Sequence, residues 1–178
     1  FLTEAGAKLV GVTDSRGLAY LPKGFDFKKL EKTKEKTGSV INYPGAKVLP
    51  NHDIVKLPLD VLIPAALPDL INAGDVDDVK AKLIVEGANI PISHPVEELL
   101  HKHGTLIIPD FVANAGGVIS SYVEYSNGSV QQMWKMVEAK LRRNTRVVLE
   151  EGRKKGVSPR TAAMAIAKKR VFAKCRTC

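Results

Sequence analysis

The stretch IIPDFVANAGGVISSY, residues 107–122, places polar groups directly after an apolar run. Carboxylates, amides or small residues follow three other apolar runs of the chain in the same way. A carboxylate can accept both hydroxyls of a ribose, and an amide, which both donates and accepts, suits a carboxamide or a sugar hydroxyl. These residue types favour the binding of an adenine nucleotide. The residues concerned are Asp14, Ser15, Arg16, Ala65, Ala66, Asn89, Asn114 and the segment from Asp110 to Gly117.

The elements that must position these groups are four short runs rich in Val, Ile and Leu without alternation. Such runs are typical of strands buried on both faces of a parallel sheet. The segments between them are helix-like or irregular, which predicts right-handed crossovers, and after residue 111 only helices are predicted. The strands are expected at 8–13, 60–64, 82–86 and 105–109, and the helices at 25–38, 95–104, 130–150 and from Pro159 onward with Ser158 as cap.

The carboxyl ends of parallel strands converge on one crevice, so the four sets of polar residues are expected to form one ligand site. Each residue also has a purely structural interpretation. Asp14 can cap a turn, Asn89 can hold its own loop, and Gly116 with Gly117 can permit close helix packing. No G-x-G-x-x-G phosphate turn is present; Phe1–Gly6 resembles the last turn of a helix, and we expect that phosphate turn upstream of it.

Bulk properties exclude several classes of protein. With 178 residues, of which 44% are hydrophobic, the chain can bury one core with a small appendage. No apolar stretch approaches the roughly 20 residues of a membrane span, and FLTEAGAKLV lacks the features of a signal peptide, so no membrane association and a cytoplasmic location are expected.

The net charge of +8 is concentrated near the carboxyl end. Residues 131–178 hold 14 of the 27 Lys and Arg but 3 of the 19 Asp and Glu, a net +11, which leaves −3 for the remainder. These cations alternate with apolar residues at helical spacing, which favours solvated helix faces over a nucleic-acid or acidic-membrane surface. Cys175 and Cys178 form a single C-x-x-C, interpreted as free thiols of the tail, with no metal site expected.

Six segments, in this order and spacing, resemble the second domain of glutamate dehydrogenases and their amino-acid dehydrogenase relatives. The resemblance implies an α/β fold of Rossmann type: a doubly wound, mostly parallel sheet that lacks its first strand and Gly-rich turn, followed by C-terminal helices. It further implies a partial NAD(P)-binding domain over 1–125 and helices over 126–178 that return toward the substrate domain. The segments are VTDSRGLAY, KTGSV, PGAK, DVLIPAAL, VEGANIP and IPDFVANAGGVISSYVEY.

The resemblance assigns roles to particular residues. Asp14 corresponds to the acid on the adenosine ribose, with Ser15 and Arg16 beside it able to accept a 2′-phosphate, so both NAD and NADP are expected as cofactors. The other implied cofactor contacts are Ala65 and Ala66 near ribose and pyrophosphate, and Asn89 and Asn114 at the nicotinamide ribose and carboxamide. Val118 and Ser121 correspond to this domain's share of the substrate pocket, with Ser121 on the side-chain carboxylate of glutamate.

The implied reaction is the reversible oxidative deamination of L-glutamate to 2-oxoglutarate and ammonia by a homo-hexamer. No catalytic residue is assigned, because the family's catalytic lysines and aspartate lie in the substrate domain, and this chain alone is expected to be inactive. Two alternatives stay open: a leucine- or valine-type dehydrogenase, and a non-enzymatic nucleotide- or nucleic-acid-binding fragment. Ile90 and Tyr125 depart from the family pattern, which more often has glycine and tryptophan there.

Overall fold

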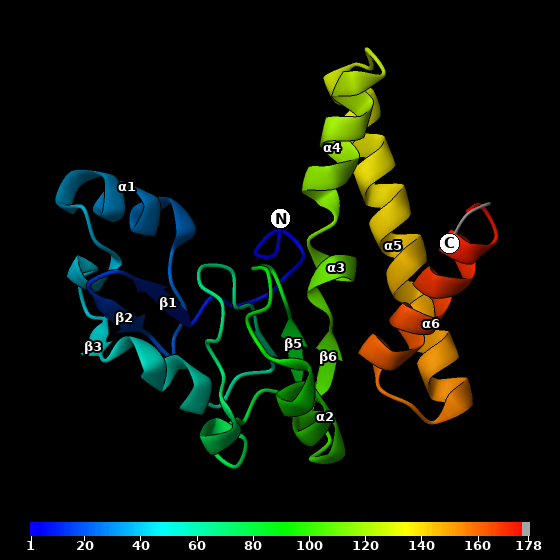
Figure 1. Cartoon of the computed structure of the whole chain (residues 1–178). Helices are drawn as coiled ribbons and strands as arrows, with labels where there is room; N and C mark the ends of the chain where they lie inside the picture. Colours follow the sequence, from blue (N-terminus) through cyan, green and yellow to red (C-terminus); the bar gives the residue numbers. More distant parts are fainter. Residues whose placement is uncertain (176–178) are drawn as a thin grey trace. The chain divides into compact units, whose positions relative to one another are not determined.

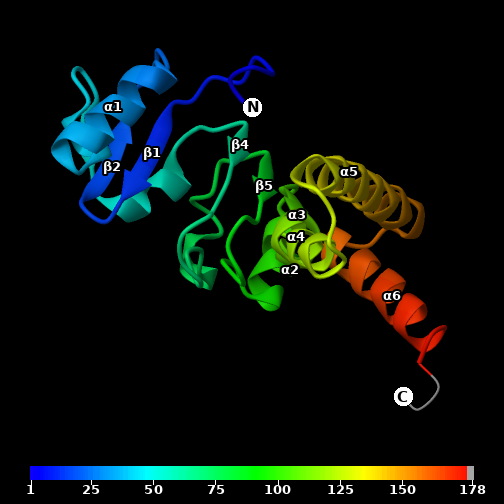
Figure 2. The same cartoon turned by 90° about the horizontal axis from the view of Figure 1, so that it is seen from above.

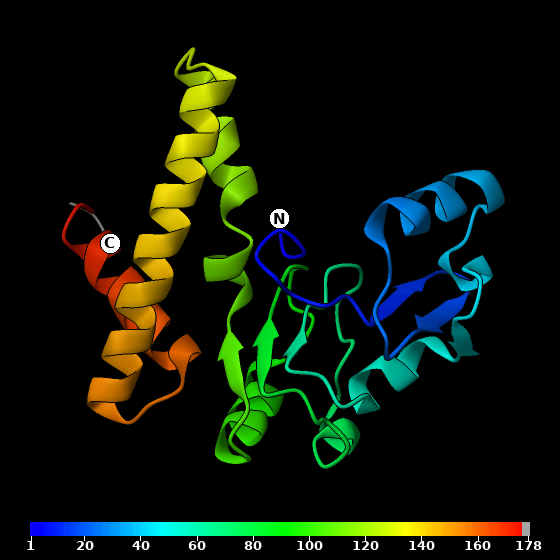
Figure 3. The ribbon, with the colours of Figure 1, turned by 180° about the vertical axis from the view of Figure 1, so that it is seen from behind.

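The computed structural model describes residues 1–175 of the chain, which divide into two compact units, Phe1–Leu57 and the described chain from Pro58 onward (Figures 1, 2 and 3). Each unit is described by itself. In the described part of the chain no helix is both long and apolar enough to cross a membrane. The division of this chain into a cofactor-binding domain over 1–125 and C-terminal helices over 126–178 stays a prediction.

The first unit contains a three-stranded antiparallel sheet in the order β1-β2-β3. One helix covers it, capped by Asp26, whose carboxylate accepts the Lys29 amide at 2.9 Å, and ended by Gly38 at φ +76°. The buried core gathers Ala19, Phe25, Leu30, Val40 and Tyr43. The elements are β1 (Gly11–Asp14), β2 (Gly17–Tyr20), α1 (Phe27–Thr37), β3 (Lys47–Leu49) and the 3-10 turns η1 (Val40–Asn42) and η2 (Asn51–Lys56).

The strand expected at 8–13 forms as β1, but its predicted place in the parallel sheet is wrong. β1 and β2 make a hairpin whose register pairs Asp14 with Gly17, leaving Ser15 and Arg16 as a two-residue loop. Gly17 has φ +154°, and a Cβ there would lie 3.1 Å from Ile41 Cγ2, so a side chain at this position would be strained. The tight turn sends the chain back antiparallel instead of into a crossover.

The second unit contains the predicted parallel sheet, in the order β4-β5-β6. The predictions at 60–64, 82–86 and 105–109 are confirmed, with shorter strands than expected. A helix with Pro95 in its first turn links β5 to β6, and an irregular segment with one 3-10 turn links β4 to β5. The elements are β4 (Val61–Leu62), η3 (Ala73–Asp75), β5 (Leu83–Val85), α2 (His94–Lys102) and β6 (Leu106–Ile108).

After β6 the described chain is helical, as predicted. The long helix α5 starts at a capping box of Ser129 and Gln132 and ends at Gly156, whose φ is +63°. The last helix begins at the predicted cap, because Ser158 Oγ accepts the Thr161 amide at 3.2 Å. These helices are α3 (Asp110–Ala113), α4 (Gly116–Tyr125), α5 (Val130–Lys155) and α6 (Pro159–Phe172).

The helices pack on the β6 side of the sheet through a core of Ile108, Val112, Val148 and Ala163 (Figure 1). Not every apolar residue of these helices is packed: Val130 on α5 and Phe172 on α6 are exposed. The expectation of free tail thiols is wrong for Cys175, which is disulfide-bonded. Cys178 lies outside the described residues.

Candidate functional site

A pocket of about 510 Å³ opens at the carboxyl ends of β4 and β5. It brings together the residues that the sequence predicted after these two strands. Its walls come from two short segments, one on each strand end, so the parallel register of β4 and β5 positions the site. The lining residues are Ala65, Ala66, Pro68, Gly87, Ala88, Asn89 and Ile90.

The two walls approach closely because Gly87 has no side chain. A Cβ on Gly87 would lie 3.1 Å from the Cβ of Ala65, tighter than ordinary contact. The Pro64 carbonyl accepts the amides of Gly87 at 2.9 Å and Ala88 at 2.8 Å, which fixes this spacing. Small residues at 65, 66, 87 and 88 therefore leave backbone, rather than side chains, facing the pocket.

Asn89 lines this pocket and is hydrogen-bonded to Asn114, so two polar residues that the sequence placed after neighbouring strands lie together. Asn114 Nδ2 donates to Asn89 Oδ1 at 2.7 Å and to the Ala88 carbonyl at 3.3 Å. Asn114 ends the short helix α3, so this bond connects the segment after β6 to the segment after β5. Within residues 1–175, Asn114 Oδ1 and Asn89 Nδ2 make no hydrogen bond, which leaves one acceptor and one donor group for a ligand.

The start of α4 presents the predicted glycines and serines. A Cβ on Gly117 would meet nothing within 4 Å, and one on Gly116 would make an ordinary 3.6 Å contact with Val137. Packing inside the described chain therefore does not require either glycine. Val118 is 77% exposed, and Ser121 lies one turn further along the same face. The hydroxyls of Ser120 and Ser121 both donate to the Gly117 carbonyl, at 2.7 and 3.2 Å.

Asp14, in the first unit, stabilises the β1–β2 turn and the segment after α1 by accepting hydrogen bonds from both. Its Oδ1 accepts the Arg16 amide at 2.9 Å and Ser39 Oγ at 3.1 Å, and its Oδ2 accepts Lys34 Nζ at 2.6 Å and the Val40 amide at 2.9 Å. Burial raises the pKa of Asp14, but these hydrogen bonds outweigh it and hold the pKa well below its usual range. The structural interpretation of Asp14 is confirmed, and its role toward a ribose stays a prediction.

Ser15 and Arg16 form the exposed tip of the β1–β2 hairpin. A Cβ on Gly38 would lie 3.6 Å from Arg16 Nη2, which places the guanidinium over the end of α1. The 2.9 Å bond from the Arg16 amide to Asp14 fixes the backbone of the loop. Among the described residues the Arg16 guanidinium forms no ion pair. It can therefore contact an anion.

A buried charge cluster, formed by Glu86, Glu97, Asp110 and Arg160, adjoins the pocket residues at Gly87 and Ile90. Asp110 was among the residues that the sequence singled out, but its pairing with Arg160 and the two glutamates was not predicted. Glu86 directly follows β5, Glu97 belongs to α2, Asp110 begins α3 and Arg160 lies in the first turn of α6. Arg160 Nη2 donates to Glu86 Oε2 and to Asp110 Oδ1, both at 2.9 Å, and its Nε donates to Glu97 Oε1. The position of Glu86 and Asp110 at strand ends was the available signal.

Burial sets the pKa values in this cluster. Burial, together with the charge of Glu86, raises the pKa of Glu97 to about 8 despite the nearby guanidinium. Burial likewise raises the pKa of Glu86. Burial also acts to raise the pKa of Asp110, but hydrogen bonds from the Ile90 and Phe111 amides and from Arg160 outweigh it and lower the pKa. The cluster therefore holds more protons at neutral pH than three ordinary carboxylates.

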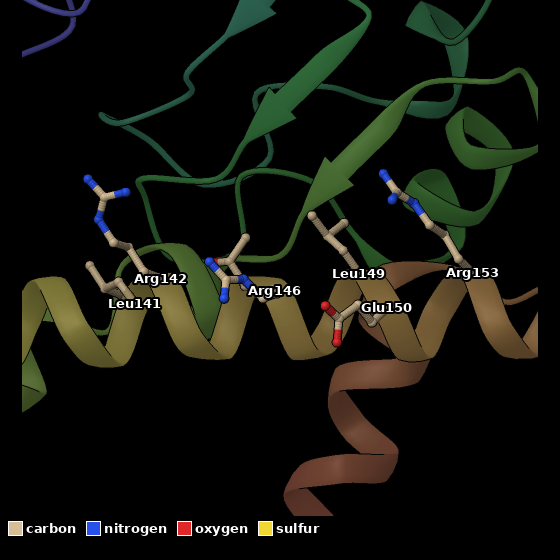
Figure 4. A pocket seen from close by; sticks show the side chains of 7 residues that line it. Leu141, Arg142, Arg146, Leu149, Glu150 and Arg153 are labelled. Atoms are coloured by element: carbon tan, nitrogen blue, oxygen red, sulfur yellow. The ribbon is translucent and has the colours of Figure 1, made fainter.

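A second pocket, also of about 510 Å³, lies along α5 and contains none of the sequence-predicted residues. Figure 4 shows Arg142, Arg146 and Arg153 projecting to the same side of this helix. Arg142 pairs with Glu138 at 2.9 Å one turn earlier, and Lys155 pairs with Glu151 at 2.6 Å. These pairs are the usual pattern of a solvated helix face.

Comparisons with known proteins converge on one family. The family model described as Glutamate/Leucine/Phenylalanine/Valine dehydrogenase matches residues 1–177. The glutamate dehydrogenase of Aeropyrum pernix is 42% identical over 97% of this chain and 44% of its own length. The NADP-specific glutamate dehydrogenase of Saccharolobus shibatae is 39% identical over 96% of this chain and 42% of its own.

A solved structure agrees with the sequence comparison. The hetero-hexameric glutamate dehydrogenase of Thermus thermophilus, in a leucine-bound form, superposes with a TM-score of 0.84 and 27% identity. The match covers 98% of this chain and 42% of that one. The chain thus spans less than half the length of the relatives it matches.

Proposed function

The chain belongs to the glutamate/leucine/phenylalanine/valine dehydrogenase family, and on this basis we propose that it is the nicotinamide-cofactor-binding part of a glutamate dehydrogenase. The complete protein would catalyse the reversible oxidative deamination of L-glutamate with NAD or NADP. The fold we propose for the complete domain is a Rossmann-type, doubly wound sheet to which β4, β5 and β6 contribute. A hexamer is proposed by analogy with the Thermus relative.

The observation that carries the proposal is the hydrogen-bonded pair of Asn89 and Asn114 at a pocket walled by backbone. The pair leaves an acceptor on Asn114 and donors on Asn89. A nicotinamide carboxamide offers the complementary donor and acceptor. A Cβ on Gly87 would lie 3.1 Å from the Cβ of Ala65, so the glycine keeps this wall free of a side chain and leaves room for a flat ring and its ribose. The residues present therefore fit a nicotinamide nucleotide.

The residues of this chain would bind and orient rather than transfer protons. Ala65 and Ala66 let the backbone approach the ribose and pyrophosphate, and Asn89 with Asn114 would fix the orientation of the nicotinamide ribose and carboxamide. When bound, the cofactor supplies the hydride acceptor for the α-carbon of the amino acid. Correct orientation of the two reacting carbons is this domain's contribution to the rate. We assign no catalytic residue here.

The exposed face of α4 supports glutamate as substrate. Val118 and Ser121 lie together on this face, and Ser121 contributes a hydroxyl whose present partner, at 3.2 Å, is a backbone carbonyl. Rotation of that hydroxyl would let it donate to a side-chain carboxylate, an interaction that an alkyl side chain cannot use. A leucine- or valine-type activity is therefore the less favoured alternative.

The complete protein provides the test. Purified full-length protein should reduce NAD or NADP with L-glutamate at a much higher kcat/KM than with L-leucine or L-valine. Asn89→Ala and Asn114→Ala should raise KM for the cofactor, while Asn144→Ala, on α5, should not. A protein that prefers leucine would contradict the substrate assignment. A protein that binds no nicotinamide nucleotide, or binds nucleic acid with an affinity that falls steeply with salt, would contradict the proposal itself.

A further inference from the structure

We propose that Arg160 is a positioning residue of the nucleotide pocket, acting from α6 through Glu86 and Asp110 on the pocket wall of residues 87–90. Arg160 lies outside the pocket lining, and its guanidinium reaches the wall only through these two carboxylates. The identity of the bound ligand rests on the function proposed above. The mechanical role of Arg160 rests on the hydrogen bonds of this unit alone.

The guanidinium of Arg160 holds the pocket wall at both of its ends. Glu86 immediately precedes the wall, and its Oε2 accepts Arg160 Nη2 at 2.9 Å and the Asp110 amide at 2.8 Å. Asp110 Oδ2 accepts the amide of Ile90, the last residue of the wall, at 3.0 Å. One cation therefore fixes the carboxylates that determine where the segment from Gly87 to Ile90 begins and ends.

The far end of the wall needs this support because Ile90 has φ +49°. A β-branched residue in the left-handed region is strained and adopts it only where its surroundings hold it. Two hydrogen bonds do so: the Ile90 carbonyl accepts the Asp69 amide at 3.0 Å, and the Ile90 amide donates to Asp110 Oδ2 at 3.0 Å, which is the bond that depends on the charge cluster. Loss of that bond would allow Ile90 to relax, and Asn89, its neighbour, would lose its position against Asn114.

Arg160 supplies the positive charge that balances the carboxylates of the cluster. Three carboxylates, from β5, α2 and the start of α3, surround this guanidinium, and no other cation among residues 1–175 pairs with Glu86, Glu97 or Asp110. Glu86 is fully buried, and its Oε1 already lacks a partner. Without Arg160 the carboxylates would repel one another or take up protons, and the bond to Ile90 would weaken.

Arg160 is itself held in place by contacts that do not involve the pocket. Pro159 and the Ser158 cap fix the first turn of α6, and Ser158 Oγ donates to Glu98 Oε1 on α2. The guanidinium carbon also lies 5.3 Å from the centroid of the Phe111 ring. The guanidinium is thus fixed before any ligand binds, as a positioning residue must be.

The test uses the complete protein with Arg160→Met, Arg160→Lys and the control Arg170→Met. Arg170 stands on the same helix but contacts Asn144, at 3.3 Å, outside the cluster. The first measurement needs no cofactor: hydrogen exchange of the Ile90 amide. We expect exchange to accelerate roughly tenfold or more in Arg160→Met, which removes the cation, and to stay unchanged in Arg170→Met. Arg160→Lys should accelerate exchange to a smaller extent, because a lysine keeps the charge but cannot bridge three carboxylates.

The second measurement is the affinity for NAD(H) and NADP(H) as a function of pH. Arg160→Met should weaken it roughly tenfold and change its pH profile from that of the wild type, because loss of the guanidinium raises the pKa values of Glu86, Glu97 and Asp110. KM for glutamate should change less than KM for the cofactor. Arg160→Lys provides the same comparisons if the methionine variant does not fold.

The two proposals fail in different ways. Unchanged exchange at Ile90 in a folded Arg160 variant would overturn the positioning role, whatever the cofactor. A variant that merely unfolds at lower temperature, with the affinity and pH profile of the wild type, would overturn it as well. Accelerated exchange in a protein that binds no nicotinamide nucleotide would uphold the role of Arg160 and sink the proposed function.

Discussion

Asn114 donates its side-chain amide to the side-chain oxygen of Asn89 at 2.7 Å. The bond joins residues that are 25 positions apart in the chain and follow neighbouring parallel strands. It fixes which atom of each amide faces the pocket, because Asn114 uses its nitrogen and Asn89 its oxygen. The pair therefore has one arrangement in which to meet a ligand.

We expect the two asparagines to act on the cofactor as a coupled pair. Asn89→Ala and Asn114→Ala should each weaken cofactor binding, and the double variant should lose less than the sum of the two. The coupling energy should be about 0.5–1.5 kcal/mol, the usual net value of one hydrogen bond. A double-mutant cycle on cofactor affinity measures it. Strict additivity would contradict the pairing.

Ser121→Ala should lower kcat/KM for glutamate roughly ten- to a hundredfold, since a hydrogen bond to a carboxylate is worth about 1.5–3 kcal/mol. Affinity for the cofactor should hardly change. Ser120→Ala is the matched control, because Ser120 donates to the same Gly117 carbonyl from the neighbouring position. Steady-state kinetics of both variants decide the assignment, and equal losses would show that only the helix start was disturbed.

Arg16→Ala should weaken the use of NADP more than the use of NAD. The exposed guanidinium can pair with a 2′-phosphate, whereas NAD presents only a hydroxyl there. The measurement is the ratio of kcat/KM values for the two cofactors. Arg142→Ala, which removes an exposed arginine of the second unit, serves as the control. Equal losses with NAD and NADP would mean that Arg16 points elsewhere.

Asp14→Asn should destabilise the protein above about pH 4 and leave it less sensitive to acid. The pKa of folded Asp14 lies below that of the unfolded chain, about 4. Its stabilisation is therefore present above that pH and is lost as the pH falls. Urea denaturation at neutral pH should show a loss of about 1–3 kcal/mol. Asp60→Asn, which breaks an exposed pair with Lys82, should change the midpoint little.

Glu97→Gln should alter the pH dependence in the opposite direction. The pKa of folded Glu97 is raised to about 8, so its stabilising protonated form is lost as the pH rises toward that value. The glutamine variant should therefore lose less stability than the wild type as the pH rises from about 5 to about 8. Glu98→Gln is the control, because a hydrogen bond from Ser158 lowers the pKa of Glu98. Thermal unfolding across this range measures both.

Local patterns predicted most of the elements but not their partners. Three apolar runs became the parallel strands β4, β5 and β6, and Ser158 with Pro159 marked the start of α6 correctly. The run at 8–13 has the same composition, yet it forms a hairpin in another sheet. The composition of an apolar run predicts a strand. It does not predict which other strand pairs with it, because pairing depends on which segments meet in space.

The candidate site likewise contains residues that the sequence predicted and one that it did not. Asn89, Asn114 and the alanines after β4 could be placed from strand ends alone, since parallel strands share an edge. Arg160 could not, because it sits in a basic tail among arginines that are exposed. Only its pairing with Glu86 and Asp110, 74 and 50 positions earlier, distinguishes it from those neighbours.

The four hydrogen bonds that Asp14 accepts have a consequence for affinity. A carboxylate offers about four lone-pair positions, and the donors of the first unit occupy them all. A ribose hydroxyl can therefore bind there only by displacing one of these donors, and Lys34, whose side chain is 44% exposed, returns to water most readily. The nucleotide and Lys34 would then compete for one oxygen of Asp14. Substitutions that stabilise the hairpin would therefore lower the affinity for the nucleotide, whereas Lys34→Met would lower the stability of the first unit and raise that affinity.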